Sequence, residues 1–235
     1  KEPHVGDRTR ADAERLVELG EQYSLPTRGY GSYLRAGAIS ESEVTRELEF
    51  ASHLGADYIR VWAGEQEYEE YTQSHWEAVV ADLRMIADRA AQRDIEVTVE
   101  RHFGTLTNRQ EGARRLLTEV DHPNCGLNWQ TYCEQHPDSH NNIQRTEAEI
   151  LADVRELVPI SNNLHVQSWP APGADERGRV EESFYSWERI FEELRELDYA
   201  GRIQIEFTDP NEDYESALRQ DYHALRELVS NELRT

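Results

Sequence analysis

Four polar side chains of metal-binding type each close a short apolar run in this chain. They are separated by 30, 35 and 41 residues and are, in chain order, Glu100, Gln130, His165 and Glu206. Each apolar run is typical of a buried strand, and each gap is long enough for a loop, a helix and a second loop. Because the carboxyl ends of parallel strands lie at one end of a barrel, we expect the four side chains to converge there. Three oxygen ligands and one imidazole suit Mn²⁺, Mg²⁺ or Co²⁺, with Zn²⁺ also open.

Strand and helix patterns alternate along the chain. Six strands are predicted, each followed by a helix, and one further helix precedes them; the strands are Pro26–Tyr33, Asp57–Trp62, Ile95–Glu100, Cys125–Gln130, Leu164–Gln167 and Arg202–Phe207. This order indicates βα units around a parallel sheet. The predicted fold is therefore an α/β (βα)8 TIM barrel that lacks the first strand, the first helix and the second strand. An open doubly wound sheet is disfavoured, because no glycine-rich phosphate loop follows any strand.

Three helix starts carry the capping-box pattern, in which a hydroxyl residue precedes an acid or amide by three positions. The pattern begins at Ser40, at Thr107 and at Thr146. We expect a helix to begin directly after each of these residues.

Composition favours one domain over residues 1–235, N-terminally incomplete, because no linker or low-complexity segment divides the chain. No apolar run approaches the roughly 20 residues of a membrane span, so no membrane partner is expected. The net charge is −22, from 47 acidic and 25 basic residues, and all the basic residues except Lys1 are arginine. This charge disfavours nucleic-acid binding.

The acidic residues are spread along every predicted helix, which indicates a solvated acidic surface. Salt relieves the self-repulsion of such a surface. We therefore hypothesise a halophilic protein adapted to a salt-rich cytoplasm, an idea that full stability in salt-free buffer would contradict. Cys125 and Cys133 do not make a disulfide framework, and two free thiols fit a reducing, cytoplasmic location.

Side chains alternate between the two faces of a strand. The apolar set of each strand is expected to pack on helices, and the polar set to face the barrel interior. Arg101 follows Glu100 with the opposite parity, so we expect it to face away from the interior. A single polar residue at a strand end usually marks only the start of a loop. Four in register are harder to explain in this way, because buried carboxylates are costly unless they are paired or bind a metal.

Five segments of the chain together resemble the sugar phosphate isomerase/epimerase superfamily, the xylose isomerase-like TIM barrels. In chain order they are Asp57–Gly64, Val97–Gly104 with Thr105–Thr107, His122–Gln130, Leu164–Trp169 and Ile203–Phe207. No segment is diagnostic alone, and the resemblance rests on five occurring in the right order. It extends from about Thr9 to the C-terminus.

This resemblance implies a divalent metal ion held by Glu100, Gln130, His165 and Glu206. It also implies a metal-dependent enzyme that isomerises or epimerises a sugar or sugar phosphate. Glu100 and Glu206 would move a proton off and onto the substrate through an enediolate. Gln130 stands where many members of the superfamily have Asp. Its amide oxygen carries less charge, so we expect weaker metal binding.

Four further residues are candidates for substrate binding. Arg60 could hold a phosphate or carboxylate, or it could pair with Glu100 or the other glutamate of that strand. His102 could bond a substrate hydroxyl, or it could be an ordinary loop histidine. Trp62 and Trp169 could wall a sugar site.

Other functions stay open at this point. One is a non-catalytic barrel that binds a carbohydrate or metabolite. Another is an AP-endonuclease-like, metal-dependent phosphodiesterase, but it needs further His and Asp ligands, and no Asp-x-His motif follows His165. A dehydratase or aldolase on the same scaffold cannot be separated from an isomerase by sequence. A homo-oligomer also stays open.

Overall fold

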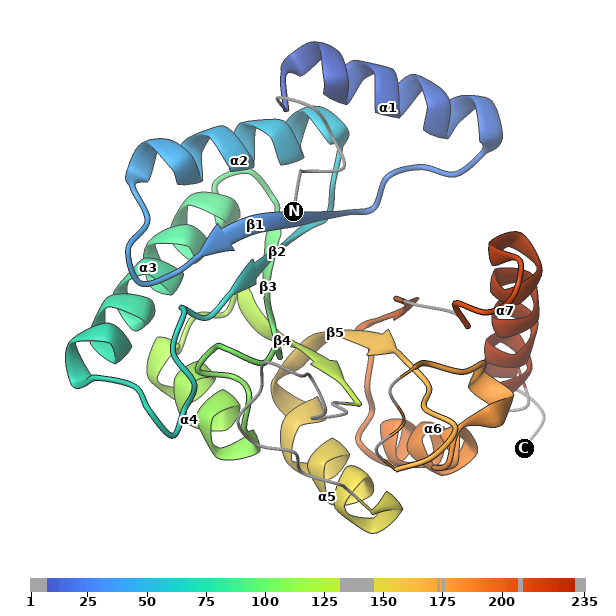
Figure 1. The fold of residues 1–235 in the computed structure, drawn as a ribbon. Helices are drawn as coiled ribbons and strands as arrows, with labels where there is room; N and C mark the ends of the chain where they lie inside the picture. The colour runs from blue at the N-terminus through green and yellow to red at the C-terminus, as the bar shows by residue number, and fades with distance from the viewer. Residues whose placement is uncertain (1–7, 132–145, 173, 175, 207–208, 231–235) are drawn as a thin grey trace. The chain divides into compact units, whose positions relative to one another are not determined.

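The structure is a computed structural model that describes residues 8–131, 146–172, 174, 176–206 and 209–230 (Figure 1). Its helices are α1 (Arg10–Tyr23), α2 (Glu41–Leu54), α3 (Gln73–Ala91), α4 (Gln110–Val120), α5 (Glu147–Leu157), α6 (Trp187–Glu196) and α7 (Tyr214–Ser230), with short 3-10 helices η1 (Val158–Ile160) and η2 (Val180–Glu182). Its strands are β1 (Gly29–Arg35), β2 (Tyr58–Trp62), β3 (Glu96–Glu100), β4 (Cys125–Gln130), β5 (Ser161–Val166) and β6 (Arg202–Ile205).

The predicted alternation of strands and helices is confirmed. The six strands of the described residues follow one another in the sheet in chain order, and the strand pairs β1–β2, β2–β3, β4–β5 and β5–β6 are parallel. Each strand is followed by a helix, and α1 precedes β1. This is the α/β pattern of a TIM barrel with six of its eight βα units in the described part of the chain.

The chain forms two compact units. Unit 1 comprises Lys1–Glu100 and Thr105–Gly126, and unit 2 comprises Arg101–Gly104 and Leu127–Thr235. The division falls directly after Glu100, so the last residue of β3 is covalently joined to a residue that belongs to unit 2. The expectation of one domain over residues 1–235 stays a prediction.

In unit 1, α2 packs on β1 and β2, and α3 packs on β3 (Figure 1). The predicted capping box of α2 is present, since the Ser40 hydroxyl accepts from the Glu43 amide while the Glu43 carboxylate accepts from the Ser40 amide. Gly55 ends this helix with a φ of 67°, a conformation that glycine adopts at little cost. The N-cap and the C-cap fix the two ends of α2, and its buried side chains pack against the strands.

The predicted helix start at Thr107 is wrong. Helix α4 begins at Gln110, and its N-cap Arg109 makes no side-chain capping bond. The Thr107 hydroxyl instead donates to the Glu100 carbonyl at 2.7 Å. This carbonyl lies where β3 ends, so it needs a donor. Thr107 is buried and supplies that donor.

In unit 2, the helix-facing side of the strands carries a buried ion pair. Arg101 is fully buried and pairs with Asp153 of α5, which also accepts from the Trp129 indole at 2.9 Å. The expectation that Arg101 points away from the polar strand face is therefore confirmed. The predicted capping box that starts α5 at Thr146 is also present. Together these features attach α5 to the end of β4.

Two smaller expectations concern the whole chain. Cys125 is a free thiol as predicted, whereas Cys133 lies outside the described residues. Among the residues that the structure describes, no helix is long and apolar enough to cross a membrane.

Candidate functional site

In unit 1, the Glu100 carboxylate lies at the end of β3 and is bound by groups from β2. Parallel pairing sets Trp62 opposite Glu100 and Arg60 opposite Thr98, which puts these side chains on the same face of the sheet. Arg60 Nη1 lies 3.0 Å from Glu100 Oε2, and the Trp62 indole N–H donates to the same oxygen. Of the two roles predicted for Arg60, the ion pair with Glu100 is observed.

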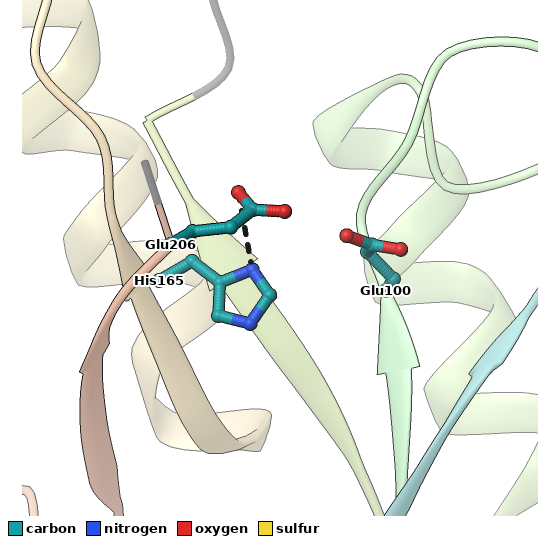
Figure 2. A group of neighbouring side chains, drawn as sticks. All are labelled: Glu100, His165 and Glu206. Atoms are coloured by element: carbon teal, nitrogen blue, oxygen red, sulfur yellow. Dashed lines mark ion pairs between the residues drawn. The ribbon is translucent and has the colours of Figure 1, made fainter. Parts of the chain in front are cut away.

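In unit 2, an imidazole, an amide oxygen and a carboxylate meet at the ends of three neighbouring strands. His165 Nδ1 lies 3.2 Å from Gln130 Oε1 and 3.3 Å from Glu206 Oε2. Figure 2 shows the imidazole of His165 directed at the carboxylate of Glu206. Pairing of β4 with β5 sets Gln130 opposite His165, and Glu206 directly follows β6. The predicted convergence of these three residues is thus observed within unit 2.

Gln167 is a member of this cluster that sequence reasoning did not propose. Its amide donates to Gln130 Oε1 at 2.8 Å and also to Glu206 Oε2. It lies two residues beyond His165 and therefore shares its strand parity. That parity was the signal that could have identified it. The Gln167 amide thus holds in place the two oxygen atoms, of Gln130 and Glu206, that lie close to the His165 imidazole.

A layer of buried amides lies beside the cluster on the same strands. Asn128 Nδ2 lies 3.0 Å from a ring nitrogen of His165. Asn163 donates to the Asn128 side chain and to Gln204, both at 2.9 Å. Since these amides bond one another across β4, β5 and β6, they fix the strand face from which His165 projects.

The electrostatics of unit 2 favour an ionised Glu206. Burial alone would raise the pKa of this carboxyl, but the hydrogen bond and charge of His165, the charge of Arg177 and the hydrogen bond from Gln167 outweigh burial and lower it. A carboxylate in this state is both a proton acceptor and an anionic ligand. It therefore suits either a base or a metal site.

The spacing of the donor atoms in unit 2 fits a metal ion. Ligand atoms about 2.1 Å from a metal and at right angles to one another are about 3 Å apart. The distances of 3.2 Å and 3.3 Å from His165 Nδ1 to the two oxygens match this spacing. Gln130 can present its oxygen because its Nε2 donates to the Arg101 carbonyl at 2.6 Å. The donor set and its separations therefore suit a divalent cation.

A family model described as a xylose isomerase-like TIM barrel matches residues 3–228. The chain belongs to this family. It is 27% identical over 161 residues to the 3-dehydroshikimate dehydratase of Bacillus anthracis, an alignment that covers 66% of this chain and 58% of that protein. The chain thus matches less than two thirds of the length of this curated relative.

Several solved structures share the fold of this chain. The 3-keto-D-glucoside 4-epimerase YcjR from E. coli is 18% identical with a TM-score of 0.69, over 92% of this chain and 85% of that one. The IOLI protein, solved with a bound zinc atom, is 15% identical with a TM-score of 0.71, over 93% and 82%. The relatives named here include a dehydratase and an epimerase.

Two other predicted substrate-binding residues of this family member lie in unit 2. His102 Nδ1 lies 2.7 Å from the Phe103 carbonyl oxygen, and its ring packs on the Phe103 ring. Trp169 is buried, and the Arg177 guanidinium lies over its ring at 5.1 Å. Arg177 Nε also lies 3.5 Å from Gln167 Oε1, which links Trp169 to the cluster. Substrate contact by either residue stays a prediction.

Proposed function

We propose that this protein is a divalent-metal-dependent isomerase or epimerase that acts on a small sugar or sugar phosphate. The observation that carries the proposal is the approach of Gln130, His165 and Glu206 within unit 2, at separations that suit ligands of one metal ion. Membership of the xylose isomerase-like family, together with similarity in structure to an epimerase, supports the reaction class.

Gln130, His165 and Glu206 would hold the metal, with Glu100 as the fourth ligand. Figure 2 draws His165 and Glu206, whose imidazole nitrogen and carboxylate oxygen lie 3.3 Å apart within unit 2. A bound divalent metal supplies Lewis-acid polarisation of a substrate carbonyl. Gln130 lowers the negative charge of the set by one compared with an aspartate, which favours a site of moderate affinity.

The covalent chain supports the inclusion of Glu100. Its neighbour Arg101 belongs to unit 2, where its amide donates to the Asn128 carbonyl at 3.2 Å and its side chain pairs with Asp153. The carbonyl of Arg101 also accepts from Gln130 Nε2. Glu100 is thus one peptide bond from the residue that orients the Gln130 amide.

Glu100 and Glu206 would carry out the proton transfers. One carboxylate takes the proton from the carbon next to the carbonyl, and the other returns a proton to the opposite face or to the neighbouring carbon. The lowered pKa of Glu206 keeps that carboxyl ionised and ready to accept. Arg60 and the Trp62 indole hold the carboxylate of Glu100 at a fixed position.

Solvent-proton exchange tests this two-base proposal. A panel of ketoses, their phosphates and keto acids is incubated with the Mn²⁺-loaded protein in D₂O, and deuterium at the carbon next to the carbonyl is followed by NMR. Glu100→Gln and Glu206→Gln should each lower the exchange rate by at least about 100-fold. Glu96→Gln, at the opposite end of β3, is the matched control and should exchange at the wild-type rate. Exchange at the wild-type rate in either active-site variant would exclude the two-base mechanism.

A dehydratase is the second candidate, favoured by the similarity to the 3-dehydroshikimate dehydratase. The same base would remove the proton next to the carbonyl, and a hydroxide on the following carbon would leave with help from a proton donor. The product then gains a carbon–carbon double bond conjugated with the carbonyl. New ultraviolet absorbance in the reaction would favour the dehydratase, whereas deuterium incorporation without new absorbance would favour the isomerase or epimerase.

A further inference from the structure

Two arginines of unit 1 stack on one tryptophan at the carboxyl ends of β1 and β2. The Arg35 guanidinium lies 4.2 Å from the centre of the Trp62 ring, and that of Arg60 lies 4.6 Å away. Tyr33 meets the same ring edge to face at 5.7 Å. Pairing sets Arg35 opposite Trp62, although the register between β1 and β2 shifts before this pair. The four side chains thus form one cationic and aromatic group.

The strands leave space for this group. Gly31 of β1 is paired with Arg60 of β2. A Cβ atom at Gly31 would lie 3.3 Å from the Arg60 guanidinium, so a larger side chain would press on it. The guanidinium can therefore lie over the backbone of β1.

The two arginines differ in how their charge is balanced. Arg60 pairs with Glu100, whereas Arg35 makes no ion pair within the described residues. Its one hydrogen bond there runs from Nη1 to the Gly64 carbonyl at 3.2 Å, although a guanidinium has five N–H donors. Burial lowers the pKa of Arg35 and the charge of Arg60 adds to that effect, whereas the charges of Glu65 and Glu100 oppose it. A half-buried guanidinium with no ion pair in the described residues is unusual in a chain of net charge −22.

Arg35 also lines a cavity of about 420 Å³ in unit 1. Two further arginines of the lining, Arg8 and Arg46, both pair with the buried Glu47 carboxylate. His75 belongs to the lining too, and burial lowers its pKa, which favours the neutral ring. The lining also carries the carboxylates of Glu43 and Glu65, and Arg35 is the arginine of the described lining for which no ion pair is observed.

We propose that Arg35 binds an anionic oxygen group of the substrate, a carboxylate or a phosphate, and so restricts the enzyme to acidic or phosphorylated sugars. This inference rests on the proposed function, since it names the substrate class of that enzyme. Stacking on Trp62 fixes the plane of the guanidinium, and its remaining N–H groups can then meet two oxygens side by side. Arg60 stays with Glu100 and adds positive charge nearby.

Binding of three matched sugars tests the proposal. Glucose, glucuronate and glucose 6-phosphate share a ring and differ at one carbon, which carries a neutral, a carboxylate or a phosphate group. Calorimetry with the metal-free protein compares wild type, Arg35→Gln, Arg35→Lys and the control Arg28→Gln. Arg28 is exposed just before β1 and pairs with Asp57, so its loss changes the net charge equally without touching the Trp62 group.

We expect wild type to prefer one or both anionic sugars over glucose, and the tighter anion identifies the natural group. Arg35→Gln should weaken anion binding about 10- to 100-fold, Arg35→Lys should weaken it less, and Arg28→Gln should leave it unchanged. No preference for anions in wild type, or equal losses in Arg35→Gln and Arg28→Gln, would overturn the proposal.

A parallel Mn²⁺ titration of His165→Ala keeps the two hypotheses apart. If His165→Ala loses Mn²⁺ binding but Arg35→Gln binds the anionic sugars as wild type does, the inference about Arg35 is overturned and the metal site stands. If Arg35→Gln loses anion binding but His165→Ala binds Mn²⁺ as wild type does, the metal site is overturned and the inference stands.

Discussion

The strand ends of the two units carry different chemistry on the same βα architecture. In unit 1 the Glu100 carboxylate is neutralised by a guanidinium and an indole from the neighbouring strand. In unit 2 the Glu206 carboxylate is met by an imidazole and a neutral amide, His165 and Gln167. Glu100 thus pairs with a permanent cation, whereas the partners of Glu206 include an imidazole, a side chain that can also serve as a metal ligand. The two strand-end carboxylates are therefore held by different kinds of partner, each within its own unit.

The largest expected effect comes from the buried ion pair that attaches α5 to the end of β4. Asp153→Ala would leave the Arg101 guanidinium buried without its partner, so the free energy of unfolding should fall by about 3–5 kcal/mol. Urea denaturation measures this change. The exposed pair of Arg219 with Glu215 is the control, since Arg219→Ala should cost about 0.5 kcal/mol or less. Equal effects at the two sites would show that unit 2 does not depend on its buried pair.

A smaller effect is expected from the indole hydrogen bond in unit 1. Trp62→Phe removes the donor to the Glu100 carboxylate, and a bond to a charged group contributes about 1.5–3 kcal/mol. A double-mutant cycle with Glu100→Gln isolates this bond from the change in ring size. We expect a coupling energy of about 1–3 kcal/mol by urea denaturation. Strict additivity of the two substitutions would mean that the indole does not hold the carboxylate.

Gln130 is the one uncharged oxygen ligand proposed for the metal, so replacing it tests how ligand charge affects metal binding in unit 2. Gln130→Asp adds a negative charge to the cluster of unit 2 but shortens the side chain and removes the bond to the Arg101 carbonyl. Added ligand charge should dominate and tighten Mn²⁺ binding about tenfold. Isothermal calorimetry provides the measurement, and Asn at the same position is the control for length. Tighter binding by Gln130→Asn as well would show that side-chain length, not charge, limits the site.

The smallest expected effect is the pH dependence that Asp221 of α7 adds to unit 2. Its Oδ1 accepts from the Val180 amide at 2.8 Å, whereas its buried Oδ2 has no hydrogen-bond partner in the described residues. Burial raises its pKa, against the opposing effects of the Val180 amide and Arg179 and with a further increase from Glu182 and Glu212.

Because the folded state favours protonated Asp221, its stabilising effect is complete below the unfolded pKa of about 3.9 and is lost as the pH rises through the folded pKa. Asp221→Asn should therefore be more stable than wild type at pH 7, and the gap should close toward pH 4. Thermal melts at both pH values measure it. Glu227→Gln, an exposed substitution on the same helix, should show no such trend. A gap that widens toward pH 4 would contradict the raised pKa.

Much of the fold follows from periodicity and caps. The strand Cys125–Gln130 was predicted at its observed bounds, and α2 begins directly after its predicted capping residue Ser40. The first strand was predicted too early, since β1 runs from Gly29 to Arg35. Its bounds depend on pairing with β2, which a local pattern does not contain.

The site was predictable at the level of residue positions. Strand parity identified His165 and Gln130, because both end apolar runs and point to one face. Arg35 was missed because it lies two residues beyond the predicted strand, so no parity was assigned to it. The bonds of Gln167 and the pairing of Arg101 with Asp153 depend on contacts between residues far apart in sequence, which single-strand patterns do not encode.

Metal stoichiometry tests the central claim most directly. Metal-free wild-type protein is titrated with Mn²⁺ by calorimetry, beside His165→Ala and the exposed control His223→Ala. We predict one site per chain in wild type and in His223→Ala, with binding at least tenfold weaker in His165→Ala because the imidazole ligand is lost. Equal Mn²⁺ binding by His165→Ala and wild type would contradict the assignment of Gln130, His165 and Glu206 as the metal site.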